Sequence, residues 1–200
     1  MKILAIMGSS RKNSNTDKFL ELFVKKFKLQ DEDLEKYTLR DLNYDGCTSC
    51  YGCGRVPKCV VKDDLTEIYS KIEEADLIIV STPIYFNSVS SLTKQFIDRT
   101  QVYWSRKFIL KLRPIKEKYG IALINGGAFN QENQFLGSEL VFDHFFKATS
   151  CKKNMFVEVS NTDRFPINEN NDEFVSFLDS IKLDFNVSNV YRFEGGINEN

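Results

Sequence analysis

Short apolar runs that alternate with helix-like stretches are the feature that most constrains how this chain can fold. The run DLIIVS at 76–81 is nearly all apolar and β-branched, which is typical of a central strand buried on both faces. Similar runs, KILAIM and YGIALI, stand at 2–7 and 119–124. Strands of this kind separated by helices form a parallel sheet that is covered on both sides. The pattern therefore predicts an α/β fold.

The complete pattern predicts one domain with five strands and five intervening or flanking helices. The expected strands are 2–7, 34–39, 76–81, 119–124 and 155–159, and the expected helices are 16–28, 64–74, 92–102, 135–146 and 172–183. We assign residues 1–185 to this single domain, with a cysteine-rich loop at about 45–62. The Asn-rich segment 186–200 is expected to be a loosely ordered polar tail.

The composition excludes several classes of protein. Among 200 residues, 27 Lys and Arg stand against 28 Asp and Glu, so the net charge is −1 and the basic excess of a nucleic-acid-binding protein is missing. No apolar run approaches the roughly 20 residues that span a bilayer. The first residues, MKILAIMGSS, become polar too quickly for a signal peptide. We therefore expect a cytoplasmic protein without nucleic-acid or membrane partners.

The loop GSSRKNSNT at 8–16 follows the predicted first strand and runs directly into a helix. A helix N-terminus offers unpaired N–H groups and a partial positive charge, which suit a phosphate group. Further donors are available on the side chains of Ser9, Arg11, Ser14, Asn15 and Thr16. The loop is neither a GxGxxG loop nor a P-loop, and it fits the monophosphate of flavin mononucleotide (FMN). The alternative is a polar helix cap formed by Ser14 or Asn15.

Two further loops leave the same predicted sheet edge, where open parallel sheets bind ligands. Apolar surface beside amide and hydroxyl donors suits an isoalloxazine ring, and the alternative is an aromatic turn packed beneath the next helix. Paired glycines can bring backbone N–H groups close to the pyrimidine edge of a flavin, or they can form a plain turn. The residues concerned are Pro83, Ile84, Tyr85, Phe86, Asn87 and Ser88 after the third strand, and Asn125, Gly126 and Gly127 after the fourth.

The segments GSSRKNSNT, KCVVKDDL and EEADLIIVSTPIYFNSVSSLTKQFIDR make the chain, over about 1–127, resemble the flavodoxin-like NADPH-dependent FMN reductase family. Within that family it is most similar to the iron-sulfur flavoproteins. The resemblance implies a flavodoxin-like three-layer sandwich whose parallel sheet has the strand order 2-1-3-4-5. It also implies a homodimer or homotetramer. The implied FMN contacts are Ser9, Arg11, Ser14, Asn15 and Thr16 at the phosphate, and 83–88 and 125–127 around the ring.

Four of the five cysteines lie in one short stretch, Cys47-x2-Cys50-x2-Cys53-x5-Cys59. Because a reducing compartment is expected, this group favours metal or redox chemistry over a disulfide scaffold. Iron-sulfur flavoproteins use such compact spacing for a [4Fe-4S] cluster, and four thiolates on one glycine-containing loop can wrap one. Zinc bound by the four thiolates is an alternative. Cysteines without a metal, either free or in a disulfide, are another.

These features predict an FMN-dependent oxidoreductase. Bound FMN would pass electrons from a reduced donor, with NAD(P)H as the expected co-substrate, to a small-molecule or protein redox partner. A [4Fe-4S] cluster would extend the path to one-electron partners. No catalytic acid or base is predicted, because the sequence suggests no Ser-His-Asp, Cys-His or paired-carboxylate arrangement. The alternatives are a non-enzymatic flavodoxin-like electron carrier and a protein that senses metal or redox state through its cysteines.

Overall fold

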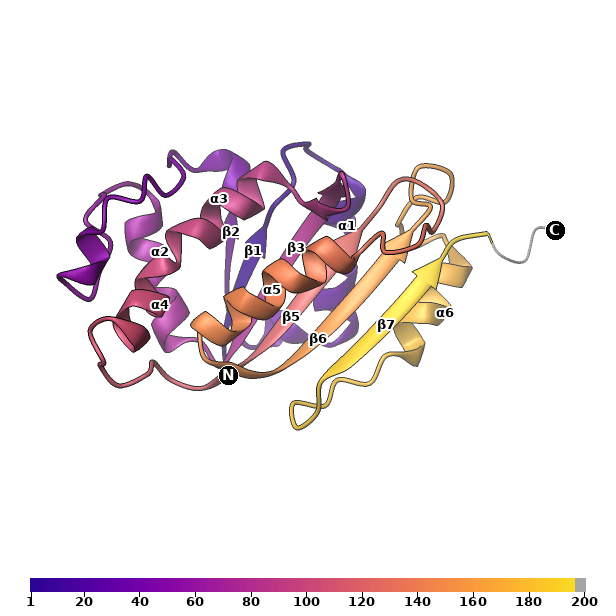
Figure 1. The fold of residues 1–200 in the computed structure, drawn as a ribbon. Coiled ribbons are helices and arrows are strands. Elements are labelled where there is room, and N and C mark those ends of the chain that lie inside the picture. Colours follow the sequence, from indigo (N-terminus) through magenta and orange to yellow (C-terminus); the bar gives the residue numbers. More distant parts are fainter. Residues whose placement is uncertain (197–200) are drawn as a thin grey trace.

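Residues 1–196 are described by a computed structural model, which shows one sheet with helices on both faces (Figure 1). The strands are β1 (Lys2–Met7), β2 (Asp33–Thr38), β3 (Leu77–Tyr85), β4 (Ser88–Val89), β5 (Lys118–Asn125), β6 (Cys151–Ser160) and β7 (Asn189–Glu194). The helices are α1 (Asn15–Lys26), α2 (Leu65–Glu74), α3 (Ser91–Arg99), α4 (Gln101–Phe108), α5 (Leu136–Ala148) and α6 (Asp172–Ser180). Within this range no helix is long and apolar enough to cross a bilayer.

The sheet is parallel along its main path, with the strands in the order β2-β1-β3-β5-β6-β7. The short strand β4 pairs antiparallel with β3 and stands off this path. Successive residues of a strand face opposite sides of a sheet, so β3 contributes to two cores. Ile78 and Val80 belong to the core under α2, α3 and α5, whereas Leu77 and Ile79 belong to the core under α1 and α6.

The expectation of a five-stranded sheet is wrong, because residues 1–196 contain seven strands. The five expected strands correspond to β1, β2, β3, β5 and β6, and the flavodoxin-like α/β architecture is as predicted. The strand β4 is only two residues long, which is too short to produce an apolar pattern. The strand β7 lies in the segment that was expected to be a loose tail, of which 197–200 fall outside the described residues.

The strand β7 forms because its segment alternates apolar and polar side chains. Tyr191 and Phe193 pack against the core on the α6 side of the sheet. On the opposite face, Arg192 donates to the fully buried carboxylate of Glu158 on β6 at 2.7 Å. It also donates to Glu139 on α5 at 2.7 Å. These contacts attach β7 to both layers of the fold, and the prediction of a loosely ordered tail is therefore wrong for 189–194.

The single helix expected at 92–102 is divided into α3 and α4, which meet at Thr100. The Thr100 hydroxyl donates to the backbone carbonyl of Ile97 at 2.6 Å. Local bonds of this kind compete with the regular helical pattern and bend the chain. As a result α4 departs from the direction of α3 and lies beside the cysteine-rich loop (Figure 1).

Candidate functional site

The loops that follow β1, β3 and β5 meet at the carboxyl edge of the sheet. The Gly8 N–H donates to the Ser81 carbonyl at 2.7 Å, and the Ser81 hydroxyl donates to the Thr16 carbonyl at 3.1 Å. The Thr16 hydroxyl in turn donates to the side-chain oxygen of Asn125 at 2.8 Å. These bonds connect loop 8–16 with the middle of β3 and the end of β5, so the fold brings the predicted residues Thr16 and Asn125 together.

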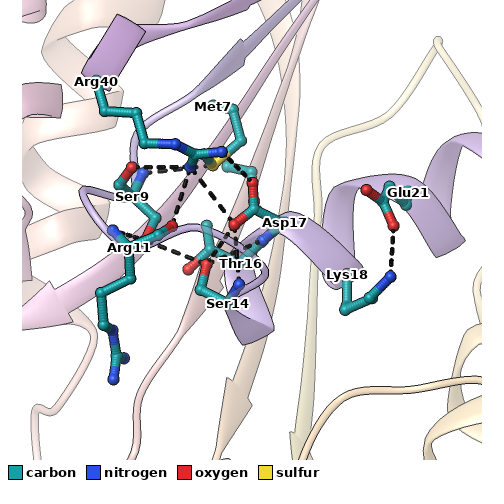
Figure 2. Close-up of polar contacts among 10 residues, drawn as sticks. Met7, Ser9, Arg11, Ser14, Thr16, Asp17, Lys18, Glu21 and Arg40 are labelled. Carbon is teal, nitrogen blue, oxygen red and sulfur yellow. Dashed lines mark hydrogen bonds and ion pairs between the residues drawn. The ribbon is translucent and has the colours of Figure 1, made fainter.

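Ser14 begins α1 as its N-cap and forms a capping box with Asp17. The Asp17 carboxylate accepts the Ser14 N–H at 2.9 Å and lies 2.8 Å from the Ser14 hydroxyl. The Ser14 hydroxyl oxygen also lies 3.1 Å from the Ser9 hydroxyl oxygen (Figure 2). Ser9, Ser14 and Thr16 thus place three buried hydroxyls at the N-terminus of α1. The helix cap considered as the alternative is therefore present and is formed by Ser14.

Arg11 and Asn15 are the other predicted phosphate contacts. They differ in whether their side chains are already hydrogen-bonded within the protein. The Asn15 amide donates to the Thr162 carbonyl at 3.0 Å, and its oxygen accepts the Ile167 N–H at 2.9 Å. Asn15 therefore joins α1 to the segment after β6 and has little donor capacity left. The Arg11 side chain is exposed and points away from loop 8–16 (Figure 2). Of the two, only Arg11 is free to contact a ligand in this conformation.

Asp17 and Arg40 belong to this site although neither was predicted. Arg40 Nη2 lies 3.0 Å from Asp17 Oδ1, and both side chains are largely buried. The spacing Ser14-x-x-Asp17 is that of a capping box, so a local pattern does mark Asp17. Arg40 lies 23 positions beyond Asp17, and no local pattern indicates its contact with the loop.

The residues expected to contact the ring form a tight hairpin between β3 and β4. Phe86 and Asn87 occupy its two turn positions with φ of +50° and +57°, a region that non-glycine residues rarely adopt. Phe86 is fully exposed, so the alternative interpretation, an aromatic turn packed beneath the next helix, is wrong for this residue. Strained turns that present exposed side chains are common at functional sites. By exposure the six residues divide into Pro83, Ile84 and Ser88, which are buried or half-buried, and Tyr85, Phe86 and Asn87, which are exposed.

Neither glycine after β5 has a positive φ, so neither is needed for its backbone conformation, and each instead lies close to a neighbouring side chain. A Cβ on Gly126 would lie 2.9 Å from the Ile84 side chain, and one on Gly127 would lie 2.4 Å from the Asp163 carboxylate. The Gly126 N–H donates to the Val159 carbonyl at 2.8 Å. This N–H is therefore not available to a flavin, which corrects the role expected for it.

The four clustered cysteines line one cavity of about 460 Å³ between the cysteine-rich loop and α4. Cys47 and Cys50 are exposed, and Cys53 and Cys59 are half-buried. Cys53 Sγ lies 3.3 Å from the Ser105 hydroxyl oxygen on α4. Among residues 1–196, no three Cys, His, Asp or Glu side chains stand close enough together to hold a metal ion. The structure thus gathers the predicted ligands around one cavity without converging them on one point.

The cysteine-rich loop runs along α3, away from the hairpin. The Tyr44 hydroxyl donates to the Leu92 carbonyl at 2.9 Å, and Gly46 lies against Gln95 in the middle of the helix. The cavity is lined by Arg99, the last residue of α3, and by Ser105 on α4. Nine helical residues rise by about 13 Å, so the cysteines lie roughly one helix length from the hairpin that precedes α3 (Figure 1).

Arg99 joins the two ends of the cysteine-rich loop and was also not predicted. Its side chain is only 2% exposed. Before the first cysteine, Nη1 donates to the Asp45 carbonyl at 2.8 Å. After the last cysteine, the guanidinium donates to the Asp63 carboxylate at 2.6 and 3.2 Å and to the Val61 carbonyl at 3.4 Å. Arg99 therefore holds the base of the loop closed.

Replacing Arg99 with methionine should lower the free energy of unfolding by about 3 kcal/mol, because it leaves the Asp63 carboxylate buried without its partner. Chemical denaturation measures this change, and limited proteolysis should cut the variant faster within 45–62. Lys94→Met is the matched control, since it removes an exposed ion pair with Asp98 on the same helix and should cost less than about 0.5 kcal/mol. Equal effects of the two substitutions would contradict a closing role for Arg99.

The fold and the site define a flavodoxin-like α/β protein with a polar helix N-terminus at the carboxyl edge of its sheet. Residues 1–156 of the 200 match the family described as NADPH-dependent FMN reductase. The chain therefore belongs to that family, and the resemblance predicted from its motifs is confirmed.

Individual relatives agree with this assignment. An iron-sulfur flavoprotein of Archaeoglobus fulgidus is 32% identical over 124 residues, which are 62% of this chain and 54% of that protein. One of Methanosarcina thermophila is 32% identical over 130 residues, which are 65% of each chain. The matches thus span between about half and two thirds of these relatives' lengths. The structure of an NAD(P)H:quinone oxidoreductase from Methanothermobacter marburgensis shares the fold, with a TM-score of 0.63 and 13% identity over 87% of this chain and 92% of that one.

Proposed function

We propose that this chain is an NAD(P)H-dependent flavin oxidoreductase that binds FMN at the three loops of the carboxyl edge. One observation carries the proposal. The buried hydroxyls of Ser9, Ser14 and Thr16 gather at the N-terminus of α1, and the Thr16 hydroxyl is bonded to Asn125 at the end of β5. Membership of the NADPH-dependent FMN reductase family supports both the cofactor and the co-substrate. The electron acceptor would be a small-molecule or protein redox partner, and the chain would act as a homo-oligomer.

The chemistry of loop 8–16 fits a phosphate monoester. The Ser9 and Ser14 hydroxyl oxygens lie 3.1 Å apart, close enough to bind oxygens of one phosphate. The helix N-terminus adds its partial positive charge at the same place. Arg11 is exposed and available as a charged donor from the edge of the loop. These are the features that a phosphate-binding loop needs when it has neither a P-loop nor a metal.

The β3–β4 hairpin fits the ring of the cofactor. Tyr85 and Phe86 present aromatic surface there, and Asn87 adds a side-chain amide at the turn. When bound, FMN supplies the redox chemistry, which is hydride acceptance from NAD(P)H and electron transfer in one- or two-electron steps. The protein's own residues would bind the phosphate, orient the ring and shield the ring from water on the side of the hairpin.

Purified protein tests this function directly. FMN should copurify or bind on addition, giving the absorption bands of a flavin, and NAD(P)H should bleach them under anaerobic conditions. Steady oxidation of NAD(P)H in the presence of an added quinone should follow. Protein that binds no FMN would overturn the proposal. Bound FMN that NAD(P)H does not reduce would instead identify a flavodoxin-like electron carrier.

Ser14→Asp should weaken FMN binding by at least about 10-fold, because it places a second carboxylate where the phosphate would bind. Aspartate is a good N-cap in general, but here it would face the Asp17 carboxylate, so circular dichroism should first show that α1 remains intact. Asn171→Asp makes the same kind of change at the N-cap of α6, outside the proposed site, and should leave FMN affinity unchanged. Quenching of flavin fluorescence measures both dissociation constants. Equal affinities of Ser14→Asp and the unmodified protein would count against this placement of the phosphate.

We propose further that Cys47, Cys50, Cys53 and Cys59 hold a [4Fe-4S] cluster. Four thiols are the donor set that such a cluster uses, and all four line one cavity. Arg99 anchors both ends of the loop that carries them, which keeps the four cysteines on the same side of α4. When bound, the cluster would supply one-electron transfer. The relatives named iron-sulfur flavoproteins support this assignment.

Anaerobically purified protein should contain about four iron and four sulfide per chain by this proposal. Cys50→Ser should lose most of that iron, whereas Cys151→Ala should keep it, because Cys151 is buried at the start of β6 outside the cavity. Metal analysis together with a sulfide assay decides the question. Zinc in place of iron, or thiols that stay free of metal after anaerobic reconstitution, would contradict the cluster.

A further inference from the structure

Arg40 contacts loop 8–16 from the chain segment just after β2. Its Nη1 donates to the carbonyl oxygens of Ser9 and Arg11 at 3.2 and 3.0 Å. Its Nη2 donates to Asp17 Oδ1 at 3.0 Å (Figure 2). The Arg40 side chain is 16% exposed, and its bonds to Ser9 and Asp17 are partly buried, whereas its bond to the Arg11 carbonyl is exposed. One guanidinium therefore binds both the loop backbone and the acidic residue of the capping box.

The bonds from Arg40 determine which way the loop backbone faces. The loop has no cis peptide bond, and in a trans peptide the C=O of one residue and the N–H of the next point in opposite directions. Because Arg40 draws the carbonyls of Ser9 and Arg11 toward itself, the N–H groups of Ser10 and Lys12 point away from it. Neither N–H makes a hydrogen bond to the described residues. The two carbonyl acceptors thus face Arg40, and the two N–H donors face the other way and have no partner among the described residues.

Asp17 presents an electrostatic problem for an anion at this place. Burial raises the pKa of its carboxyl, but hydrogen bonds from the Ser14 N–H, the Ser14 hydroxyl and Arg40 outweigh burial and hold the pKa below its ordinary value. The carboxylate is therefore ionised at neutral pH and lies 2.8 Å from the hydroxyl of Ser14. A phosphate bound to that hydroxyl would be a second anion within a few ångströms. Arg40 supplies the positive charge that compensates Asp17.

From this geometry we infer that Arg40 is a positioning residue that makes loop 8–16 selective for the phosphate of the flavin. It does so by neutralising Asp17 and by keeping the loop carbonyls out of the phosphate site. The inference rests on the proposed function, and it deepens that function by stating what distinguishes FMN from riboflavin. The two flavins share one ring, so a contribution from Arg40 should appear in the affinity for FMN alone.

Dissociation constants of FMN and riboflavin for the flavin-free full-length protein test the inference, with thermal melting to show that each variant is folded. Arg40→Met should raise the dissociation constant of FMN about 10- to 100-fold and change that of riboflavin by less than about 3-fold. Asp17→Asn keeps the shape of the capping box and the positive charge of Arg40. It should leave FMN affinity equal or up to about 10-fold tighter, with riboflavin unchanged.

The double substitution Arg40→Met with Asp17→Asn separates charge from structure. It should recover the part of the FMN affinity that Arg40→Met loses through the uncompensated carboxylate, whereas the part lost through the loop carbonyls should remain. Parallel losses for both flavins in Arg40→Met, or weaker FMN binding in Asp17→Asn, would assign Arg40 a purely structural role and overturn the inference. Unmodified protein that binds neither flavin would instead overturn the proposed function, so the two failures are distinguishable.

Discussion

The buried hydrogen bond from the Thr16 hydroxyl to Asn125 holds the first turn of α1 against the end of β5. Much of the site depends on it, because it fixes where the helix N-terminus lies relative to the sheet edge. Parallel strands end at one edge, so the loops after β1, β3 and β5 are neighbours although they are far apart in the sequence. The polar N-terminus of α1 and the exposed aromatic hairpin consequently share one edge of the molecule.

The two proposed redox sites lie at different ends of α3. The hairpin proposed for the flavin ring immediately precedes this helix, whereas Arg99 and the cysteine cavity lie at its other end. The two proposals are therefore structurally independent. The contacts of Ser9, Ser14 and Thr16 do not involve the cysteine-rich loop, and Arg99 closes that loop without touching loop 8–16. An FMN site can stand even if the cysteines hold no metal.

Short sequence patterns predicted the structural features that depend on neighbouring residues in the chain. The apolar run of β3 indicated a strand buried on both faces, and the polar loops at the strand ends followed from it. The alternation in β7 was obscured by neighbouring asparagines, and its attachment depends on Arg192 reaching Glu158, 34 positions away. Arg40 and Arg99 were missed for the same reason, because an arginine in sequence carries no sign of being buried. Their partners lie 23 to 54 positions away, and only the tertiary fold brings them together.

Backbone amide signals recorded by NMR while FMN is added test the central claim most directly. The account predicts saturable shifts that occur together for residues of loop 8–16, of the hairpin at 84–88 and of the segment 125–127. Signals of the cysteine-rich loop should change much less, because that loop lies about one helix length away. No saturable shift, or shifts confined to residues outside these three loops, would contradict the account.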